Sequence, residues 1–246
     1  MGTAFNSEQF NSIYPEGIEN HYWNKARNMI LEKTLNDLNS KANILEIGCG
    51  KGIVCEYLRN KGFEIHGIEL AEVPVKDSLM NYIETGRDVF DLPEDFSSKI
   101  KTILLLDVIE HIEYPSDFIN NLNDKFPNLK NFIVTVPARQ EIFTNHDEFN
   151  GHFRRYDIKE LKNEFHRLKI KSTRISYLFH LLYLPALFIK LAGGNRPEKI
   201  IAPSTKFQLF FHGILSWLFY WEYAVVPSRL FGSSLLIQIE LECQEK

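Results

Sequence analysis

Cysteine, net positive charge and long apolar runs are all scarce in this chain of 246 residues. Its three cysteines (Cys49, Cys55 and Cys243) form an odd, sparse set, which argues against a disulfide framework and favours a reducing compartment. The net charge of −4 argues against a nucleic-acid-binding surface. The N-terminus lacks the basic and apolar regions of a signal peptide. We therefore expect a cytoplasmic protein without a nucleic-acid partner.

The third glycine of a dinucleotide-binding fingerprint is also missing. The segment "ILEIGCGKG" places Gly48, Gly50 and Gly52 between a strand and a helix, where glycine permits a tight turn and close approach of a ligand. The fingerprint requires a glycine at the next position, which is Ile53, so this spacing disfavours NAD. Glu69 ends the following strand, where a carboxylate can accept both hydroxyls of a ribose. The alternative is a tight turn that binds no ligand.

Apolar periodicity predicts helices and strands that alternate along the chain. The predicted helices cover residues 20–38, 52–62, 74–84, 115–126 and 157–168. The predicted strands cover 42–48, 63–70, a short stretch ending near Asp88, 100–108, 131–137, 169–176 and 233–243. This alternation predicts one α/β domain over residues 1–246 with a mostly parallel sheet. Residues 1–40 are expected to form an N-terminal helical cap.

The connection between the last two predicted strands exceeds fifty residues and is too long for a simple loop. Segments 175–189 and 207–221 contain no Lys, Arg, Asp or Glu, yet each is shorter than the roughly 20 residues of a spanning helix. In the second, a polar residue recurs at every fourth position: Gln208, His212, Ser216 and Tyr220. We interpret 176–233 as a hydrophobic helical insert. It could be a lid over a hydrophobic substrate, a dimer surface, or a membrane contact over 175–231 whose flanking basic residues meet anionic lipid.

Three segments, "LEIGCGKG", "DVFDLP" and "LLLDVIEHIEYP", resemble motifs of the class I S-adenosylmethionine-dependent methyltransferases. The resemblance implies a Rossmann-like fold with strand order 3-2-1-4-5-7-6, strand seven antiparallel, and helices on both faces. It implies S-adenosylmethionine as the cofactor and S-adenosylhomocysteine as its product. It assigns Glu69 to the ribose, Asp88 to the adenine and Asp107 to the methionine end. The implied cofactor-binding residues are Glu46, Gly48, Cys49, Gly50, Gly52, Glu69, Leu70, Asp88, Val89 and Asp107.

The stretch "HDEFNGHFRRYD" begins at His146 and follows the fifth predicted strand, so it leaves the end of the sheet where ligands bind in such folds. It resembles a pattern in a subgroup of these methyltransferases associated with envelope glycan and lipid biosynthesis. His146 or His152 could act as a general base. The arginine pair could bind a phosphate or carboxylate. The predicted acceptor-binding residues are Arg154, Arg155, Tyr156 and Trp23.

The same stretch also has a purely structural interpretation. In it, Asp157 caps a helix, the arginines form surface ion pairs and one histidine is structural. No Cys or His spacing in the chain indicates a metal site.

We expect methyl transfer from S-adenosylmethionine, directed to oxygen. The expected acceptor is an anionic or lipid-linked small molecule or glycan intermediate, approached by a protein that is cytoplasmic or held at a membrane surface. Two alternatives stay open: a methyltransferase of a soluble or quinone-type aromatic metabolite, and a non-catalytic subunit that binds the cofactor. The sequence leaves the oligomeric state open.

Overall fold

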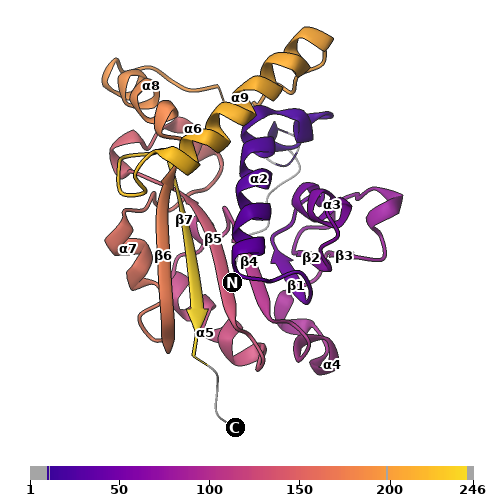
Figure 1. The fold of residues 1–246 in the computed structure, drawn as a ribbon. Helices are drawn as coiled ribbons and strands as arrows, with labels where there is room; N and C mark the ends of the chain where they lie inside the picture. The colour runs from indigo at the N-terminus through magenta and orange to yellow at the C-terminus, as the bar shows by residue number, and fades with distance from the viewer. Residues whose placement is uncertain (1–9, 11, 198, 243–246) are drawn as a thin grey trace.

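The computed structural model describes residues 10, 12–197 and 199–242, so the expected cap of residues 1–40 lies partly outside the described residues. Within them, seven strands form one sheet in the order β3-β2-β1-β4-β5-β7-β6 (Figure 1). The strands are β1 (Ile44–Ile47), β2 (Ile65–Glu69), β3 (Ile83–Thr85), β4 (Thr102–Leu106), β5 (Asn131–Pro137), β6 (Ile170–Leu178) and β7 (Ser234–Leu241). Strand β7 runs antiparallel to β5 and β6, and the other pairs are parallel. The predicted fold class and strand order are confirmed.

Helices cover both faces of this sheet. The α-helices are α2 (Tyr22–Asp37), α3 (Ile53–Asn60), α4 (Glu94–Ser97), α5 (Pro115–Lys125), α6 (Asn145–Phe149), α7 (Ile158–Asn163), α8 (His180–Leu191) and α9 (Lys206–Val225). Short 3-10 turns are η1 (Ile18–Asn20), η2 (Asp77–Leu79), η3 (Val89–Asp91), η4 (Ile109–His111) and η5 (Gln140–Ile142). Along β4, Ile103 and Leu105 belong to a core cluster shared with α5 and α7, and Leu104 belongs to one shared with α2 and α3. Alternate side chains of one buried strand thus join the two layers.

Capping chemistry explains where the helix after "HDEFNGHFRRYD" begins. The Glu160 backbone N–H donates to Asp157 Oδ1 at 2.7 Å, and the Asp157 N–H donates to Glu160 Oε2 at 2.9 Å. This reciprocal pair satisfies two N–H groups that a helix start leaves unpaired. The predicted capping role of Asp157 is confirmed.

The helix predicted over residues 74–84 is wrong. The structure has the single 3-10 turn η2 there, followed by β3. Val75, Leu79 and Ile83 are spaced like the apolar face of a helix, but pairing of Ile83 with Gly67 of β2 draws the chain into the sheet. Sheet pairing outweighs the weak local preference. The strand expected to end near Asp88 therefore ends earlier, at Thr85.

The insert forms α8 and α9, which lie at the end of the sheet where β7 begins (Figure 1). Because β7 runs against β5, this is also the end where the parallel strands finish. The first apolar segment does not begin as a helix, since β6 continues to Leu178 and α8 starts at His180. In the described part of the chain, neither insert helix nor any other is long and apolar enough to cross a membrane.

Helix α9 packs on α2 through a face that mixes polar and apolar side chains, including buried Phe219. Ser216 is buried, and His212 Nδ1 accepts a hydrogen bond from the Tyr22 backbone N–H at 3.1 Å. The opposite face of α9 is apolar and exposed: Phe207, Phe210, Phe211, Ile214, Trp217, Leu218, Trp221 and Val225. The helix thus buries Phe219 and Ser216 side by side but leaves a broad apolar face exposed, whereas a surface helix normally turns its apolar stripe to the core.

Candidate active site

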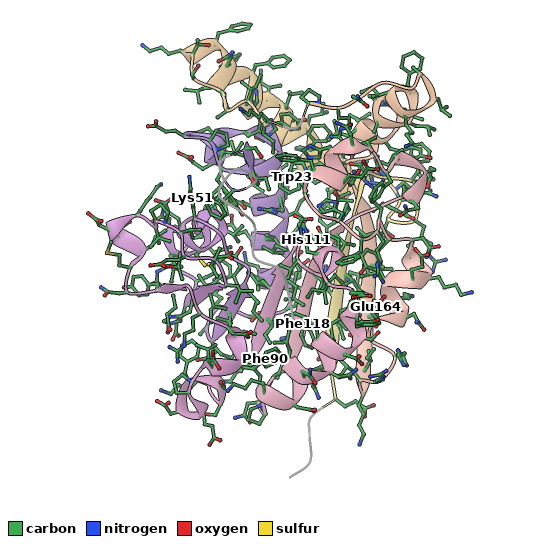
Figure 2. The ribbon with its side chains drawn as sticks, turned by 180° about the vertical axis from the view of Figure 1, so that it is seen from behind. Trp23, Lys51, Phe90, His111, Phe118 and Glu164 are labelled. Atoms are coloured by element: carbon green, nitrogen blue, oxygen red, sulfur yellow. The ribbon has the colours of Figure 1, made fainter. Side chains whose placement is uncertain are left out.

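One large cavity lies at the carboxyl end of the parallel strands, with a volume of about 1450 Å³. Small-molecule sites commonly occupy roughly 300–1,000 Å³, so this space is large enough for a cofactor and an acceptor together. Trp23, His111, Phe118 and Phe90 all line it and follow one another along the middle of the molecule in Figure 2. Its walls come from the N-terminal segment, the strand ends, the region of α6 and the insert.

The glycine turn holds a carboxylate at the edge of this cavity. Glu69, the last residue of β2, accepts hydrogen bonds from the Gly50 N–H at 2.8 Å and the Ala71 N–H at 3.0 Å. Gly48 adopts a φ of +74°, and a Cβ there would lie 2.8 Å from the side chain of Val108. The two backbone donors fix the Glu69 carboxylate at the cavity, and the glycine-rich turn leaves the space beside it open to a ligand. Gly48, Glu69 and Leu70 line the cavity.

The remaining residues of the predicted motif stand behind the turn and are not among the cavity-lining residues: Glu46, Cys49, Gly50 and Gly52. Glu46 is buried in β1 and accepts a hydrogen bond from the Cys55 thiol at 3.1 Å. Burial raises the pKa of Glu46 to about 7. The predicted cofactor-binding motif therefore has two parts. Gly48 of the glycine turn lines the cavity, and Glu46 is buried behind the turn.

The adenine end of the predicted site is lined by Asp88 and Val89. Asp88 Oδ1 accepts a hydrogen bond from the Phe90 N–H at 3.0 Å, which fixes the carboxylate just beyond β3. Apolar side chains such as Phe118 complete this wall. A carboxylate for the ribose hydroxyls, another for an amino group and apolar surface between them fit the nucleoside part of S-adenosylmethionine.

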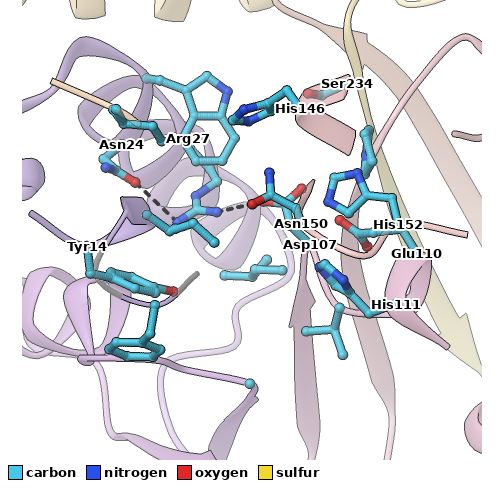
Figure 3. Close-up of a pocket in the computed structure, with 18 of the residues that line it drawn as sticks. Tyr14, Asn24, Arg27, Asp107, Glu110, His111, His146, Asn150, His152 and Ser234 are labelled. Atoms are coloured by element: carbon cyan, nitrogen blue, oxygen red, sulfur yellow. Dashed lines mark hydrogen bonds and ion pairs between the residues drawn. The ribbon is translucent and has the colours of Figure 1, made fainter. Parts of the chain in front are cut away.

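An ion pair closes the opposite end. Arg27 of α2 donates to Asp107 Oδ2 at 2.7 Å (Figure 3). Its guanidinium carbon lies 4.4 Å from the ring centroid of Trp23. Asp107 follows β4 with a φ of +58°. A non-glycine residue in this left-handed region stores about 1–3 kcal/mol of strain, and such strain gathers at functional sites. Tyr14 adds a lid, since a Cβ on Gly50 would collide with its hydroxyl. The sequence indicated Asp107 and Trp23 but gave no sign of these contacts.

The two predicted histidines both line the cavity, but their surroundings differ. His146 Nδ1 lies 3.2 Å from the carbonyl oxygen of Pro197 in the linker between α8 and α9. Burial and the nearby Arg196 lower the pKa of His146 to about 4, which makes it a weak proton acceptor near neutral pH. His152 Nδ1 lies 2.9 Å from Asp147 Oδ1. The stretch is also no simple loop, because its first residues form α6.

The arginine–arginine–tyrosine part of the stretch separates into three positions. Arg155 is buried and lines the cavity, but its Nε donates to Asp147 Oδ1 at 2.8 Å, so its charge is already neutralised. Arg154 lies outside the cavity lining and donates to the Glu113 carbonyl at 2.9 Å. Tyr156 is fully buried in the sheet core and donates to the Ile109 carbonyl at 3.3 Å. Of the predicted acceptor-binding residues, Arg154 and Tyr156 therefore lie apart from the cavity, because neighbouring residues of an extended segment point in different directions.

A carboxylate and two imidazoles meet beside Asp107. Glu110 and His111 come from η4, His152 comes from the predicted acceptor stretch, and their ligand atoms lie within 4.8 Å of one another (Figure 3). Burial and the Asp107 carboxylate raise the pKa of Glu110 well above its usual range. Burial and His152 lower the pKa of His111 to about 3. This donor set suits a divalent cation, although the sequence spacing gave no indication of a metal site.

The comparisons with known proteins agree with this geometry. The sequence model of the family described as "Methyltransferase domain" matches residues 19–168, which is more than half of the chain. The ubiquinone biosynthesis O-methyltransferase of Pseudomonas syringae pv. tomato is 26% identical over 124 residues, covering 42% of this chain and 52% of that protein. The enzyme of the same name from Dechloromonas aromatica is 29% identical over 83 residues, covering 31% and 36%. The chain therefore spans about half, or less, of the length of these relatives.

Two solved structures share the fold. The plantazolicin methyltransferase BamL, in complex with a triazolic desmethylPZN analog and SAH, has a TM-score of 0.53 at 14% identity, covering 96% of this chain and 89% of that one. The methyltransferase domain of bacterial CtHen1-CN has a TM-score of 0.51 at 14% identity, covering 89% and 99%. At this identity the likeness concerns the fold alone. With the match over residues 19–168, the chain belongs to the methyltransferase-domain family of class I S-adenosylmethionine-dependent methyltransferases.

Proposed function

We propose that this protein transfers a methyl group from S-adenosylmethionine to an oxygen of an anionic, lipid-linked acceptor at the cytoplasmic surface of a membrane. The acceptor would be a small molecule or glycan intermediate. The observation that carries the proposal is the continuity of one cavity from Glu69 and Asp88 to Leu182 and Ile189 of the apolar insert. Cofactor and acceptor would meet in that space, with the acceptor entering from the insert side.

For this reaction the protein mainly has to position the acceptor against the methyl group and exclude water from the site. Transfer from the bound sulfonium to a hydroxyl forms an O–CH3 bond, breaks the CH3–S bond and releases the hydroxyl proton. The Arg27–Asp107 ion pair fixes the strand end beside the methionine part, and Trp23 and Tyr14 keep water away from it. His146, neutral at working pH, is the candidate proton acceptor.

Basic residues of the insert support an anionic acceptor. Arg196 and Lys199 line the cavity from the linker between α8 and α9. Burial and the guanidinium of Arg155 lower the pKa of Arg196, so an acceptor phosphate or carboxylate would relieve this charge. Arg196 therefore replaces the Arg154–Arg155 pair, predicted from the sequence, as the candidate donor to the anionic group.

The apolar face supports a lipid-linked acceptor. Of the twenty large hydrophobic side chains exposed in the described part of the chain, sixteen lie in the insert, and a concentration of this kind marks an interaction surface. Five Lys or Arg residues accompany them: Lys190, Arg196, Lys199, Lys206 and Arg229. Tryptophan and phenylalanine on one face with basic flanks suit the interface of an anionic membrane.

Calorimetry tests the cofactor. We expect S-adenosylmethionine to bind, NAD not to bind, and Glu69→Ala to weaken binding at least tenfold, since the ribose hydroxyls lose their acceptor. Absence of S-adenosylmethionine binding would contradict the proposal at its base.

Vesicle flotation tests the membrane contact. We expect the protein to float with vesicles of phosphatidylcholine and phosphatidylglycerol, and Trp217→Ser/Trp221→Ser to lose most of that association. The control is Met80→Ser/Phe153→Ser, which removes exposed apolar side chains outside the insert. Equal behaviour of the two variants would argue for a lid or dimer surface.

A quinone-type aromatic acceptor is the second candidate. The similar proteins named ubiquinone biosynthesis O-methyltransferase favour it, as do the aromatic cavity walls. A prenylated catechol tests this candidate. If the protein methylates it and Arg196→Ala keeps the full activity, a quinone-type acceptor is favoured over an anionic one. Turnover with either acceptor would exclude a purely cofactor-binding subunit.

A further inference from the structure

Glu110 is a buried acid without a hydrogen-bond partner in the part of the chain that the structure describes. Its side chain is fully buried, and neither Oε1 nor Oε2 has a partner within the described residues. Buried carboxylates are normally paired or bound to a metal, because an unpaired one gives up its hydration without replacement. Glu110 also lines the cavity, so a ligand in that space can reach it.

Two imidazoles stand beside this carboxylate. The rings of His111 and His152 have their centroids 4.7 Å apart, and the ligand atoms of the three residues lie within 4.8 Å of one another. That spacing is close enough for one ion to contact all three after small side-chain adjustments, because metal–ligand bonds measure about 2.0–2.3 Å.

A second carboxylate orients His152. Asp147 is fully buried and its Oδ1 lies 2.9 Å from His152 Nδ1. The same Oδ1 accepts the Arg155 Nε–H at 2.8 Å, which holds the carboxylate in place. Metal-binding histidines typically donate their other ring N–H to such a carboxylate, which fixes the tautomer and presents Nε2 to the ion. This support exceeds what a chance cluster of polar side chains would show.

We propose that Glu110, His111 and His152 form a binding site for a divalent first-row transition metal ion. One carboxylate and two imidazoles form the mixed oxygen and nitrogen donor set that such ions accept. Three protein ligands leave coordination positions open, as in metal sites that bind a substrate.

The place of this site suggests what the open positions bind. This step rests on the proposed oxygen-directed methyl transfer. The acceptor hydroxyl would coordinate the ion, lose its proton to His146, which lines the same cavity, and use an oxygen lone pair to form the O–CH3 bond while the CH3–S electron pair stays on sulfur. Metal coordination lowers the pKa of a bound hydroxyl, so it compensates for the weak basicity of His146.

Metal binding is measured on the full chain after chelator treatment and removal of the chelator. Titration with Mn²⁺, followed by the loss of the free-ion electron paramagnetic resonance signal, is expected to show one ion per chain. Glu110→Gln and His152→Ala should each weaken binding at least tenfold, and Asp147→Asn about 10–100-fold, the range for such supporting residues. His166→Ala, an exposed histidine elsewhere, is the matched control and should bind as wild type does.

A second measurement does not depend on whether the variants fold. Pulsed electron paramagnetic resonance of the bound Mn²⁺ should show coupling to two imidazole nitrogens. Absence of nitrogen coupling, or wild-type affinity in a folded Glu110→Gln variant, would overturn the site. Full methyl transfer after proven removal of the ion would overturn its role with the acceptor. Metal binding without S-adenosylmethionine binding would instead refute the proposed function and leave the site standing.

Discussion

Helices α2 and α9 pack against each other, yet α9 leaves far more of its large apolar side chains exposed than α2 does. In α2, Ala26, Ile30 and Leu31 are buried against the sheet. In α9, Phe219 is buried, but Trp217 is 58% exposed and Phe210 is 68% exposed. Apolar content therefore identifies a helix but does not say which side faces the core. The exposed apolar face of α9 lies at the end of the sheet that carries the cavity. Such a face indicates contact with a membrane or another apolar surface.

The largest expected effect is on the free energy of unfolding, which should respond to a substitution in the core but not to one on the exposed face of the insert. Leu104→Ala, at the centre of β4, should lower the free energy of unfolding by about 2–5 kcal/mol, because it leaves a cavity between two packed layers. Trp217→Ala removes a larger side chain from the exposed face of α9 and should change the free energy of unfolding by less than about 0.5 kcal/mol. Urea denaturation of both variants measures this. A comparable loss from Trp217→Ala would mean that the exposed face is packed in solution.

The pH dependence of stability probes the buried acid behind the glycine turn. The pKa of Glu46 is about 7 in the folded protein, against 4.5 as its ordinary value. Since the folded pKa is raised, the stabilising effect is complete below pH 4.5 and is lost as the pH rises through 7. Glu46→Gln stays neutral, so its stability relative to wild type should increase by about 3 kcal/mol between pH 4.5 and 8. Denaturation at several pH values tests this.

A matched control sharpens that measurement. Glu94→Gln removes an exposed carboxylate from the first turn of α4. Its stability difference from wild type should stay flat over the same pH range. A flat difference for Glu46→Gln as well would show that the carboxylate behind the turn is already ionised in the folded state.

On the insert side, Arg196→Ala should raise the KM for an anionic acceptor by about 10–150-fold, the equivalent of about 1.5–3 kcal/mol for a hydrogen bond to a charged group. The KM for S-adenosylmethionine should not change, because Arg196 lies at the insert end of the cavity. Steady-state kinetics with both substrates provide the measurement. Arg154→Ala is the control, since Arg154 is not a cavity-lining residue. A larger effect from Arg154→Ala would restore the acceptor site expected from the sequence.

The smallest expected effect concerns the hydrogen bond between α9 and the start of α2. His212→Leu removes the acceptor of the Tyr22 N–H and should lower the free energy of unfolding by about 1–2 kcal/mol, the cost of an unpaired N–H that is partly buried. Phe211→Ser, on the outer face of α9, should be close to neutral. Thermal or urea melts compare the two. If Phe211→Ser is the more damaging, α9 must turn its apolar face inward.

Much of the fold could be predicted because its signals are local. The alternating glycines, the apolar run of β4 and the Asp157 cap each depend on neighbouring residues, and the strand order followed from the resemblance these motifs carry. The helix predicted over residues 74–84 does not form, because pairing with β2 determines the structure at the end of this segment. Sequence spacing also identified the amphipathic pattern of α9 without revealing its direction, which depends on contact with α2.

The candidate site was only partly predictable for the same reason. Glu69 and Asp88 sit in motifs and line the cavity. Tyr156 stands beside Arg155 in sequence, but its side chain turns into the core. The metal-type cluster joins residues 111 and 152 across two elements, and no spacing along the chain encodes that meeting.

The most direct test of the central claim follows a labelled methyl group. The protein is incubated with methyl-labelled S-adenosylmethionine and a membrane extract of its source organism, and the products are partitioned between chloroform and water. We expect label in the chloroform phase, in a product whose anionic group survives and whose methyl group is attached to oxygen. Label only in water-soluble products, or no transfer from a protein that binds the cofactor, would contradict a lipid-linked acceptor entering beneath the insert.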